Sequence, residues 1–410
     1  MEPNIALPLL AGLTPAQFMR RHWQKKPLVV RAAVPELVGS RPLLSRAELF
    51  KLACTQDVES RLLVKSGASW TMKNGPFSSR GLPPVSKPGW TLLVQGVDGY
   101  NAAVHQLLQQ FRFVPDARLD DVMVSFATPG GGVGAHFDSY DVFLLQACGS
   151  RRWKISKQKD LSLQPDKPLK ILQNFEPEEE FVLHAGDMLY LPPRYAHDGV
   201  AEALVDEKGK SVDCMTYSIG FTSPARQELA GELLHRLAEF NDDELEADLE
   251  RNTQHRYRDP QQAATPNPAL LPDALIHFAQ DAVHRALKDP LAIACALGEI
   301  LTAPKPRVWF DEPAQTVAVT RNSSVKADPK TRMMYDANHF FINGESYLAK
   351  GSDAALMRRL ADQRSLVPAE LAKASTSALA LLSQWCAAGW ILQLEVHHDP
   401  YDPYDPRNAT

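Results

Sequence analysis

The chain has 410 residues, of which 44% are hydrophobic and 23% are charged. This composition is typical of a globular protein with more than one domain. The net charge of -5 argues against a general nucleic-acid binder, which needs a basic surface. No apolar run approaches the roughly 18 residues of a membrane span, so no membrane association is expected. The five cysteines form no CxxC pair, which argues against disulfides and structural zinc and indicates a reducing, cytoplasmic location.

Residues 1–225 are predicted to form a β-rich domain. A helix is expected over 14–23, where Thr14 is a suitable N-cap and Pro15 a suitable first helical residue. Short apolar runs follow, separated by glycine, proline and aspartate, a pattern typical of a sandwich or barrel. The expected strands are 27–31, 90–95, 122–126, 142–146, 152–155, 188–191 and 215–221.

Residues 226–303 are predicted to be helical. Leucines recur there at three- and four-residue spacing, at Leu229, Leu233, Leu234 and Leu237. A polar segment with prolines interrupts the pattern at 255–268, and a second amphipathic run covers 272–301. An extended helical segment attached to a β-domain often packs against its own copy, so we expect a homodimer.

Residues 304–398 are predicted to form a small winged-helix-like domain, followed by a flexible tail at 399–410. The expected elements are strands at 308–310, 316–320 and 390–394, a hairpin at 340–349 around Asn343-Gly344, and helices at 353–363 and 367–388. Winged helices often bind DNA. However, residues 301–410 carry 12 basic and 12 acidic side chains, which favours a structural or protein-contact role over direct nucleic-acid binding.

The most informative segment, 130–146, contains His136 and Asp138. On a strand, residues two apart point to the same side, so this pair presents an imidazole and a carboxylate together. These are two of the three ligands of a facial triad for Fe(II). An H-x-D pair also arises by chance, and the alternative is an edge-strand histidine beside a solvated aspartate.

A third ligand is expected at His197. Segment 186–197 has a turn glycine, a short strand, a proline turn and then this histidine. It is similar to the second motif of the cupin superfamily, whose histidine is the last metal ligand, although Arg194 stands where that motif has glycine. The resemblance predicts that His197 completes the triad, and the alternative is a surface turn histidine.

Arg151 is the expected anchor of an acidic co-substrate. A co-substrate with two carboxylates that chelates iron at one end needs a fixed cation at the other, and an arginine fork binds a carboxylate bidentately. Arg152 faces the opposite side of the strand. We favour Arg151, because Trp153 shares its side; the alternatives are Arg152, or two solvated arginines.

Together these residues resemble the JmjC-type 2-oxoglutarate oxygenases, and most closely the bacterial ribosomal oxygenases. The stretches that carry the resemblance are 23–30, 129–134, 136–143, 151–153 and 214–221. The resemblance implies an α+β protein with a double-stranded β-helix (cupin/JmjC) core, Fe(II) held by His136, Asp138 and His197, and 2-oxoglutarate as co-substrate. It also implies hydroxylation at C3 of an arginine in large-subunit ribosomal protein sixteen.

The predicted strand before the motif supplies further candidates. Asp121, Met123 and Ser125 share one face. If that face lines the site, Ser125 would help to hold 2-oxoglutarate, Asp121 would pair with a substrate guanidinium and Met123 would pack on its stem. The same alternation also fits core against solvent. Tyr140 and Ser218 are similar candidates for substrate binding, with ordinary packing as the alternative.

Three rival functions remain at this point. A metal-dependent cupin enzyme acting on another protein or a small molecule would keep the triad without needing Arg151. A non-enzymatic winged-helix regulator would bind DNA through residues 304–398. Histone demethylation follows from the broader JmjC resemblance.

Overall fold

The computed structural model describes residues 2–38, 42–67, 69–165, 167–251, 257, 269, 271–287, 290–315, 317–348 and 350–394. The chain divides into two compact units, Met1–Ser223 and Pro224–Thr410. The expected second boundary near residue 303 stays a prediction. None of the described helices combines the length and the apolar character needed to cross a membrane.

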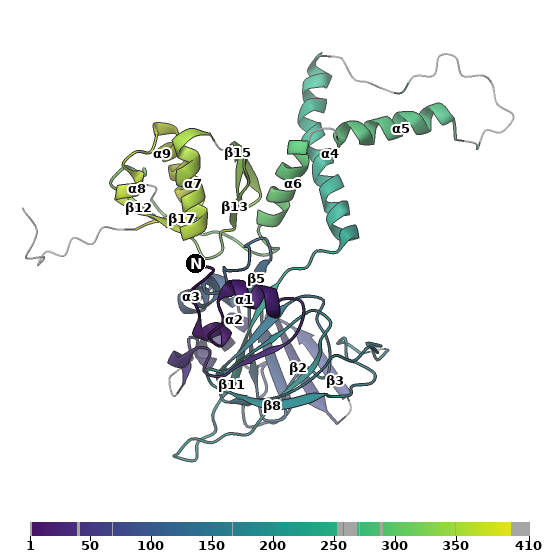
Figure 1. Cartoon of the computed structure of the whole chain (residues 1–410), viewed down its shortest axis with the longest axis vertical. Helices are drawn as coiled ribbons and strands as arrows, with labels where there is room; N and C mark the ends of the chain where they lie inside the picture. The colour runs from purple at the N-terminus through teal and green to yellow at the C-terminus, as the bar shows by residue number, and fades with distance from the viewer. Residues whose placement is uncertain are drawn as a thin grey trace, which may run out of the picture. The chain divides into compact units, whose positions relative to one another are not determined.

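The first unit is built on two antiparallel sheets, as expected for a double-stranded β-helix (Figure 1). The eight-stranded sheet has the order β1-β9-β6-β11-β5-β4-β2-β3, and the three-stranded sheet has the order β10-β7-β8. The bounds of its strands are β1 (Leu28–Val30), β2 (Ser60–Ser66), β3 (Ser69–Asn74), β4 (Trp90–Val94), β5 (Leu119–Ala127), β6 (Val142–Cys148), β7 (Ser150–Ser156), β8 (Glu179–His184), β9 (Met188–Leu191), β10 (Ala196–Ala201) and β11 (Cys214–Phe221). The expected strands of this region are therefore confirmed, and β2, β3, β8 and β10 are additional.

Helices cover one face of the eight-stranded sheet. The bounds of the helices in this unit are η1 (Pro8–Leu10), α1 (Pro15–Arg21), η2 (Pro35–Leu37), α2 (Arg46–Ala53), η3 (Val97–Gly99) and α3 (Ala102–Gln109). The expected cap of α1 is confirmed, because the Thr14 hydroxyl accepts from the Gln17 backbone N–H at 3.1 Å. The Gln17 side chain in turn accepts from the Thr14 N–H at 3.0 Å, which completes a capping box.

The largest hydrophobic core lies between this outer face and the helices. Phe18 of α1 packs edge-on against Tyr190 of β9, with ring centroids 4.9 Å apart. Phe143 of β6 lies in the same cluster, 4.9 Å from Tyr190. The inner face packs on the three-stranded sheet, where Leu144 and Leu189 join Trp153 in a second cluster. Because β6 is buried on both faces, its sequence is an almost continuous apolar run.

Within its described residues, the second unit begins with three helices, α4 (Arg226–Arg251), α5 (Asp273–Ala286) and α6 (Pro290–Thr302). The amphipathic run expected over 272–301 therefore forms two helices, because α6 begins anew at Pro290. Proline favours a first helical position and breaks a helix interior. The polar segment 255–268 lies outside the described residues except for Tyr257.

As far as the structure describes it, the rest of the second unit combines two small sheets with three helices. The bounds are β12 (Ser324–Ala327), β13 (Met333–Tyr335), β14 (His339–Ile342), β15 (Glu345–Leu348), α7 (Gly351–Gln363), β16 (Ser365–Leu366), α8 (Pro368–Leu371), α9 (Thr376–Ala387) and β17 (Ile391–Leu394). The sheet orders are β16-β12-β17 and β13-β14-β15. The expected hairpin is confirmed as β14–β15, with positive φ at Asn343 and Gly344.

Two expectations in this region were wrong. The described residues of 308–310 and 316–320 form no strand, because Val319 instead donates its N–H to Ser383 Oγ of α9 at 2.9 Å and buries its side chain. The helix expected over 367–388 is two helices, since Ser375 caps a new start at α9. The tail 399–410 lies outside the described residues.

Candidate active site

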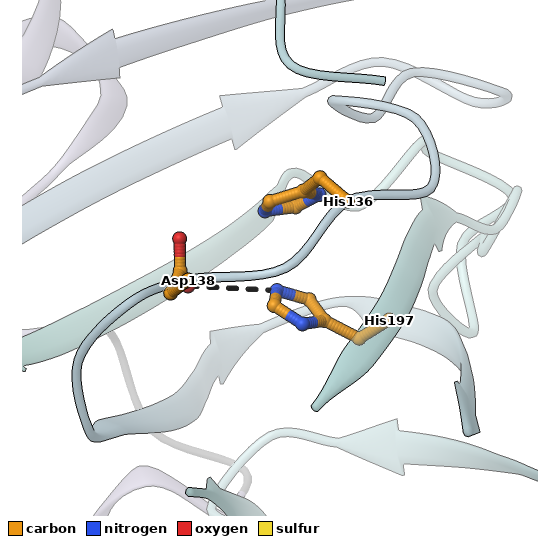
Figure 2. A group of neighbouring side chains, drawn as sticks. All are labelled: His136, Asp138 and His197. Carbon is orange, nitrogen blue, oxygen red and sulfur yellow. Dashed lines mark ion pairs between the residues drawn. The ribbon is translucent and has the colours of Figure 1, made fainter. Parts of the chain in front are cut away.

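Three predicted ligands converge on one point of the first unit. His136 and Asp138 lie in the connection between β5 and β6, and His197 lies on β10. One donor atom from each residue lies within 4.8 Å of the other two (Figure 2). Two imidazole nitrogens and one carboxylate oxygen at such spacing form the donor set of a facial triad for ferrous iron. The residues present therefore fit a single divalent cation.

The backbone that carries these donors differs from the regular strand that was expected for His136 and Asp138. His136 and His197 form an isolated bridge. The His136 N–H donates to the His197 carbonyl with an N to O distance of 2.9 Å, and the His197 N–H donates back to the His136 carbonyl at 2.8 Å. The Asp138 carbonyl accepts from the Arg194 N–H at 2.7 Å. Gly134, at φ +87°, turns the chain just before the motif, so only a short extended stretch remains.

Each imidazole is oriented by a backbone carbonyl. His136 Nδ1 lies 2.8 Å from the Gly134 carbonyl oxygen, and His197 Nδ1 lies 2.9 Å from that of Tyr195. When Nδ1 donates its proton to such a carbonyl, Nε2 keeps a lone pair for a metal. Burial and the neighbouring His136 together lower the pKa of His197 to about 4, against the opposing Asp138 charge. His197 is therefore neutral and able to bind a metal at neutral pH.

Arg151 and Arg152 of β7 lie in opposite environments. Arg151 is only 3% exposed, whereas Arg152 is exposed and binds Glu180 and Glu202, each at 2.8 Å. The register pairs Arg151 with Ala201 and Ile155 with His197. Because side chains two and four apart on a strand share a face, Arg151 and His197 point to the same, inner side of the three-stranded sheet.

The buried Arg151 guanidinium has weak partners for a cation. One amino group donates to the Gly199 carbonyl at 3.3 Å and the other contacts Cys214 Sγ at 3.9 Å. Its Nε has no hydrogen-bond partner, and no ion pair to a carboxylate is found among the described residues. Because a buried charge is costly without an opposite partner, the arrangement fits a site for an acidic ligand.

Sequence reasoning missed two polar residues beside Arg151. Thr216 of β11 donates to Gln146 Oε1 at 2.9 Å, and Gln146 Nε2 donates to Cys214 Sγ at 3.3 Å. Both side chains are buried. Ser125 lies opposite Thr216 in the sheet and donates to the Thr216 carbonyl at 3.3 Å. The available signal was Gln146 itself, a lone amide in the apolar run 142–147.

Trp153 of β7 lies near both Arg151 and His197. Its ring is 5.9 Å from the His197 ring and 5.9 Å from the Arg151 guanidinium carbon. Gly199 of β10 is paired with it, and a Cβ there would come within 2.6 Å of the indole. A glycine is therefore required for the indole to lie on β10 beside the histidine.

The structure also groups the predicted substrate contacts. Asp121, Met123 and Ser125 follow one another on one face of β5, and Ser218 of β11 lies opposite Met123. Tyr140 is 39% exposed and lies in the connection that carries Asp138. Burial raises the pKa of Tyr140, and the Asp138 and Asp121 charges raise it further.

Comparisons with known proteins agree with this geometry. Residues 106–229 match the JmjC domain family, and residues 286–391 match the ROXA-like winged helix. A ribosomal protein uL16 3-hydroxylase of Escherichia coli K12 is 35% identical over 262 residues, which cover 63% of each chain, a little under two thirds. A probable ribosomal oxygenase of Haemophilus influenzae is 31% identical over 369 residues, covering 86% of this chain and 87% of the relative.

A solved structure is similar as well. The ribosomal oxygenase YcfD of Escherichia coli, in complex with cobalt and 2-oxoglutarate, matches with a TM-score of 0.72 and 27% identity over 93% of this chain and 99% of that one. The expected double-stranded β-helix with a winged-helix end is thus confirmed. The chain belongs to the ribosomal oxygenases, a family of JmjC-domain enzymes that use 2-oxoglutarate.

Proposed function

We propose that this protein is an Fe(II)- and 2-oxoglutarate-dependent oxygenase that hydroxylates C3 of an arginine in ribosomal protein uL16. The observation that carries the proposal is the pairing of two features on one inner face. The donors of His136, Asp138 and His197 lie within 4.8 Å of one another, and the buried guanidinium of Arg151 has an Nε without a hydrogen-bond partner and forms no ion pair with a carboxylate of the described residues. The relative named as a uL16 3-hydroxylase supports the substrate.

His136, Asp138 and His197 would hold the iron, because their donor atoms are the ones that ferrous iron takes in facial triads. Three protein ligands leave coordination positions open for the co-substrate. Iron with 2-oxoglutarate and dioxygen would supply the oxidation of an unactivated C–H bond, with one oxygen atom going to the substrate, the other to succinate, and carbon dioxide released. The carbonyls of Gly134 and Tyr195 keep both imidazoles in the tautomer that this role needs.

Arg151 would bind the far carboxylate of 2-oxoglutarate. The pairs Arg151–Ala201 and Ile155–His197 are four residues apart along β7, roughly 13 Å, which an arginine side chain and a five-carbon dicarboxylate together can span. Ser125 would donate a further hydrogen bond to the same carboxylate. A buried, charge-assisted arginine–carboxylate contact both orients the co-substrate and offsets the cost of burying Arg151.

Asp121 would receive the guanidinium of the target arginine, while Met123 packs on its stem and Tyr140 and Ser218 line its path. The positions of these residues support this role, because Asp121, Met123 and Ser218 share one face of the sheet. Tyr140 belongs to the connection that carries the metal ligand Asp138. The substrate carbon would therefore be held beside the metal.

The direct test is mass spectrometry of uL16 from cells with and without this protein. We expect one arginine to carry the mass of one added oxygen atom only when the protein is present. Stoichiometric succinate formation with the purified chain and a uL16 peptide should accompany it. Peptide oxidation without succinate would instead favour a cupin enzyme that needs no 2-oxoglutarate, and formaldehyde release would favour demethylation.

We further propose that the protein acts as a homodimer in the cytoplasm, where a ribosomal protein is available. Apolar side chains of α5 are exposed, namely Leu275, Ile276, Phe278 and Val283. Burial of such a face against a second copy would remove it from water. Light scattering of the full chain would show twice the chain mass, and a monomer at micromolar concentration would contradict this proposal.

A further inference from the structure

Gln95 makes a contact at the candidate substrate site that the roles assigned so far do not use. It follows β4 directly, and its backbone N–H donates to the Glu59 carbonyl at 2.9 Å, which fixes the position of its Cα. Its side-chain Nε2 lies 2.9 Å from Oδ1 and 3.0 Å from Oδ2 of Asp121. The amide nitrogen therefore sits between the two carboxylate oxygens.

The orientation of this amide is set by its two neighbours. Arg61 of β2 donates from an amino group to Gln95 Oε1 at 3.4 Å, and the same group contacts Met123 Sδ at 3.8 Å. A guanidinium can only donate and an ionised carboxylate can only accept. The carbonyl end of the amide must therefore face Arg61, and the NH₂ end must face Asp121.

The position that Gln95 takes is the one that a guanidinium needs. A planar guanidinium pairs with a carboxylate through two parallel N–H donors, one to each oxygen. Gln95 Nε2 already faces both oxygens of Asp121, and the Asp121 residue is only 5% exposed. A guanidinium and the Gln95 amide cannot occupy this space together. A charged donor binds a carboxylate about twice as strongly as a neutral one, so a guanidinium would displace the amide.

We propose that Gln95 is a displaceable substitute for the substrate guanidinium. In the free enzyme its amide keeps the buried Asp121 carboxylate hydrogen-bonded, and on substrate binding it leaves the carboxylate while Oε1 stays on Arg61. This inference rests on the proposed role of Asp121. A ligand then enters only if its bond to Asp121 outweighs that of the amide, which favours a guanidinium fork over a weaker point charge. Gln95 is half-buried and directly follows β4, so its side chain can move away from the Asp121 carboxylate.

The test is peptide binding to the full chain loaded with cobalt(II) and 2-oxoglutarate without oxygen. The probe is a fluorescent uL16 peptide that carries the target arginine, and the readout is its dissociation constant by anisotropy. Gln95→Met removes the amide at similar length. We expect this variant to bind the peptide roughly 2- to 10-fold tighter, because the hydrogen bond between the amide and Asp121 no longer has to be broken. The matched control is Gln227→Met, on the exposed start of α4, which should leave affinity unchanged.

A double-mutant cycle separates this inference from the function on which it rests. Asp121→Asn should weaken peptide binding, and in that background Gln95→Met should no longer tighten it. If Gln95→Met weakens binding or leaves it unchanged while Asp121→Asn weakens it, the amide is no substitute and the inference fails alone. If Asp121→Asn has no effect, Asp121 does not receive the arginine, and the proposed substrate contact fails with it. Thermal unfolding of each variant checks that it is folded.

Discussion

The two faces of the eight-stranded sheet in the first unit are built from the same strands but differ in their chemistry. On the outer face, the buried Asp141 carboxylate has several partners within the protein: Tyr190 donates to it at 2.6 Å, Gln24 donates to it at 3.0 Å, and Arg118 forms an ion pair with it at 3.5 Å. On the three-stranded sheet that packs against the inner face, Arg151 has a buried Nε without a hydrogen-bond partner. Because most buried polar groups are hydrogen-bonded, this unpaired nitrogen supports a ligand site at Arg151.

The alternation along β6 shows how one strand serves both faces. Phe143 and Leu145 point outward into the helix-covered core, whereas Leu144 and Gln146 point inward. Substitutions on the outer face should therefore reduce stability. Substitutions of the inner polar groups should reduce ligand binding and spare stability.

The largest effect is expected for His197→Ala, which removes one of the three donors at the inner site. Succinate formation that depends on the peptide should fall to background, because two remaining donors hold iron poorly. The midpoint of thermal unfolding without metal should hardly change. Near-normal turnover of this variant would reject the triad.

The opposite behaviour is expected for Phe143→Ala on the outer face. Loss of a fully buried aromatic ring should lower the free energy of unfolding of the first unit by about 3–5 kcal/mol. The fraction that remains folded should keep its half-saturating 2-oxoglutarate concentration. Denaturant titration measures the stability and steady-state kinetics measure the 2-oxoglutarate dependence. A specific loss of co-substrate affinity would contradict the proposed difference between the two faces.

Arg151→Ala should act on the co-substrate alone. We expect the half-saturating 2-oxoglutarate concentration to rise about 30-fold, equivalent to ~2 kcal/mol for a charge-assisted hydrogen bond. Arg152→Ala is the matched control, because its partners are exposed carboxylates and surface pairs contribute little. An unchanged requirement in Arg151→Ala, or a rise only in Arg152→Ala, would place the anchor elsewhere.

The smallest effect is expected for Thr14→Ala, at the start of α1 on the outer side. Loss of the N-cap should lower stability by about 1 kcal/mol and leave the kinetics unchanged. The same denaturant titration detects it. A change in 2-oxoglutarate dependence would show that the helical layer influences the site directly.

The sequence was sufficient where a local pattern decides the structure. The alternation predicted that Arg151 and Arg152 face opposite sides, with Arg151 favoured because Trp153 shares its side, and Thr14 with Pro15 predicted the start of α1. Strand β10 gave little signal, because its Gly199 is required by the Trp153 ring and not by the strand itself. Strand propensity depends on such tertiary context.

The residues of the candidate site also divide into those that a local pattern predicts and those that depend on tertiary context. His136 and Asp138 could be proposed from their spacing and His197 from its resemblance to the cupin motif, and the structure brings their donors together. Gln95 could not be proposed, because its relation to Asp121 depends on the pairing of β4 with β5. A lone glutamine after an apolar strand has many possible roles, and only the register shows which carboxylate it meets.

The most direct test is a crystal structure of the full chain with cobalt(II) and 2-oxoglutarate. The account predicts one anomalous peak at coordination distance from His136, Asp138 and His197 together, with the far carboxylate of 2-oxoglutarate on the Arg151 guanidinium. A metal bound away from these three residues, or a co-substrate that leaves Arg151 without a carboxylate, would contradict it.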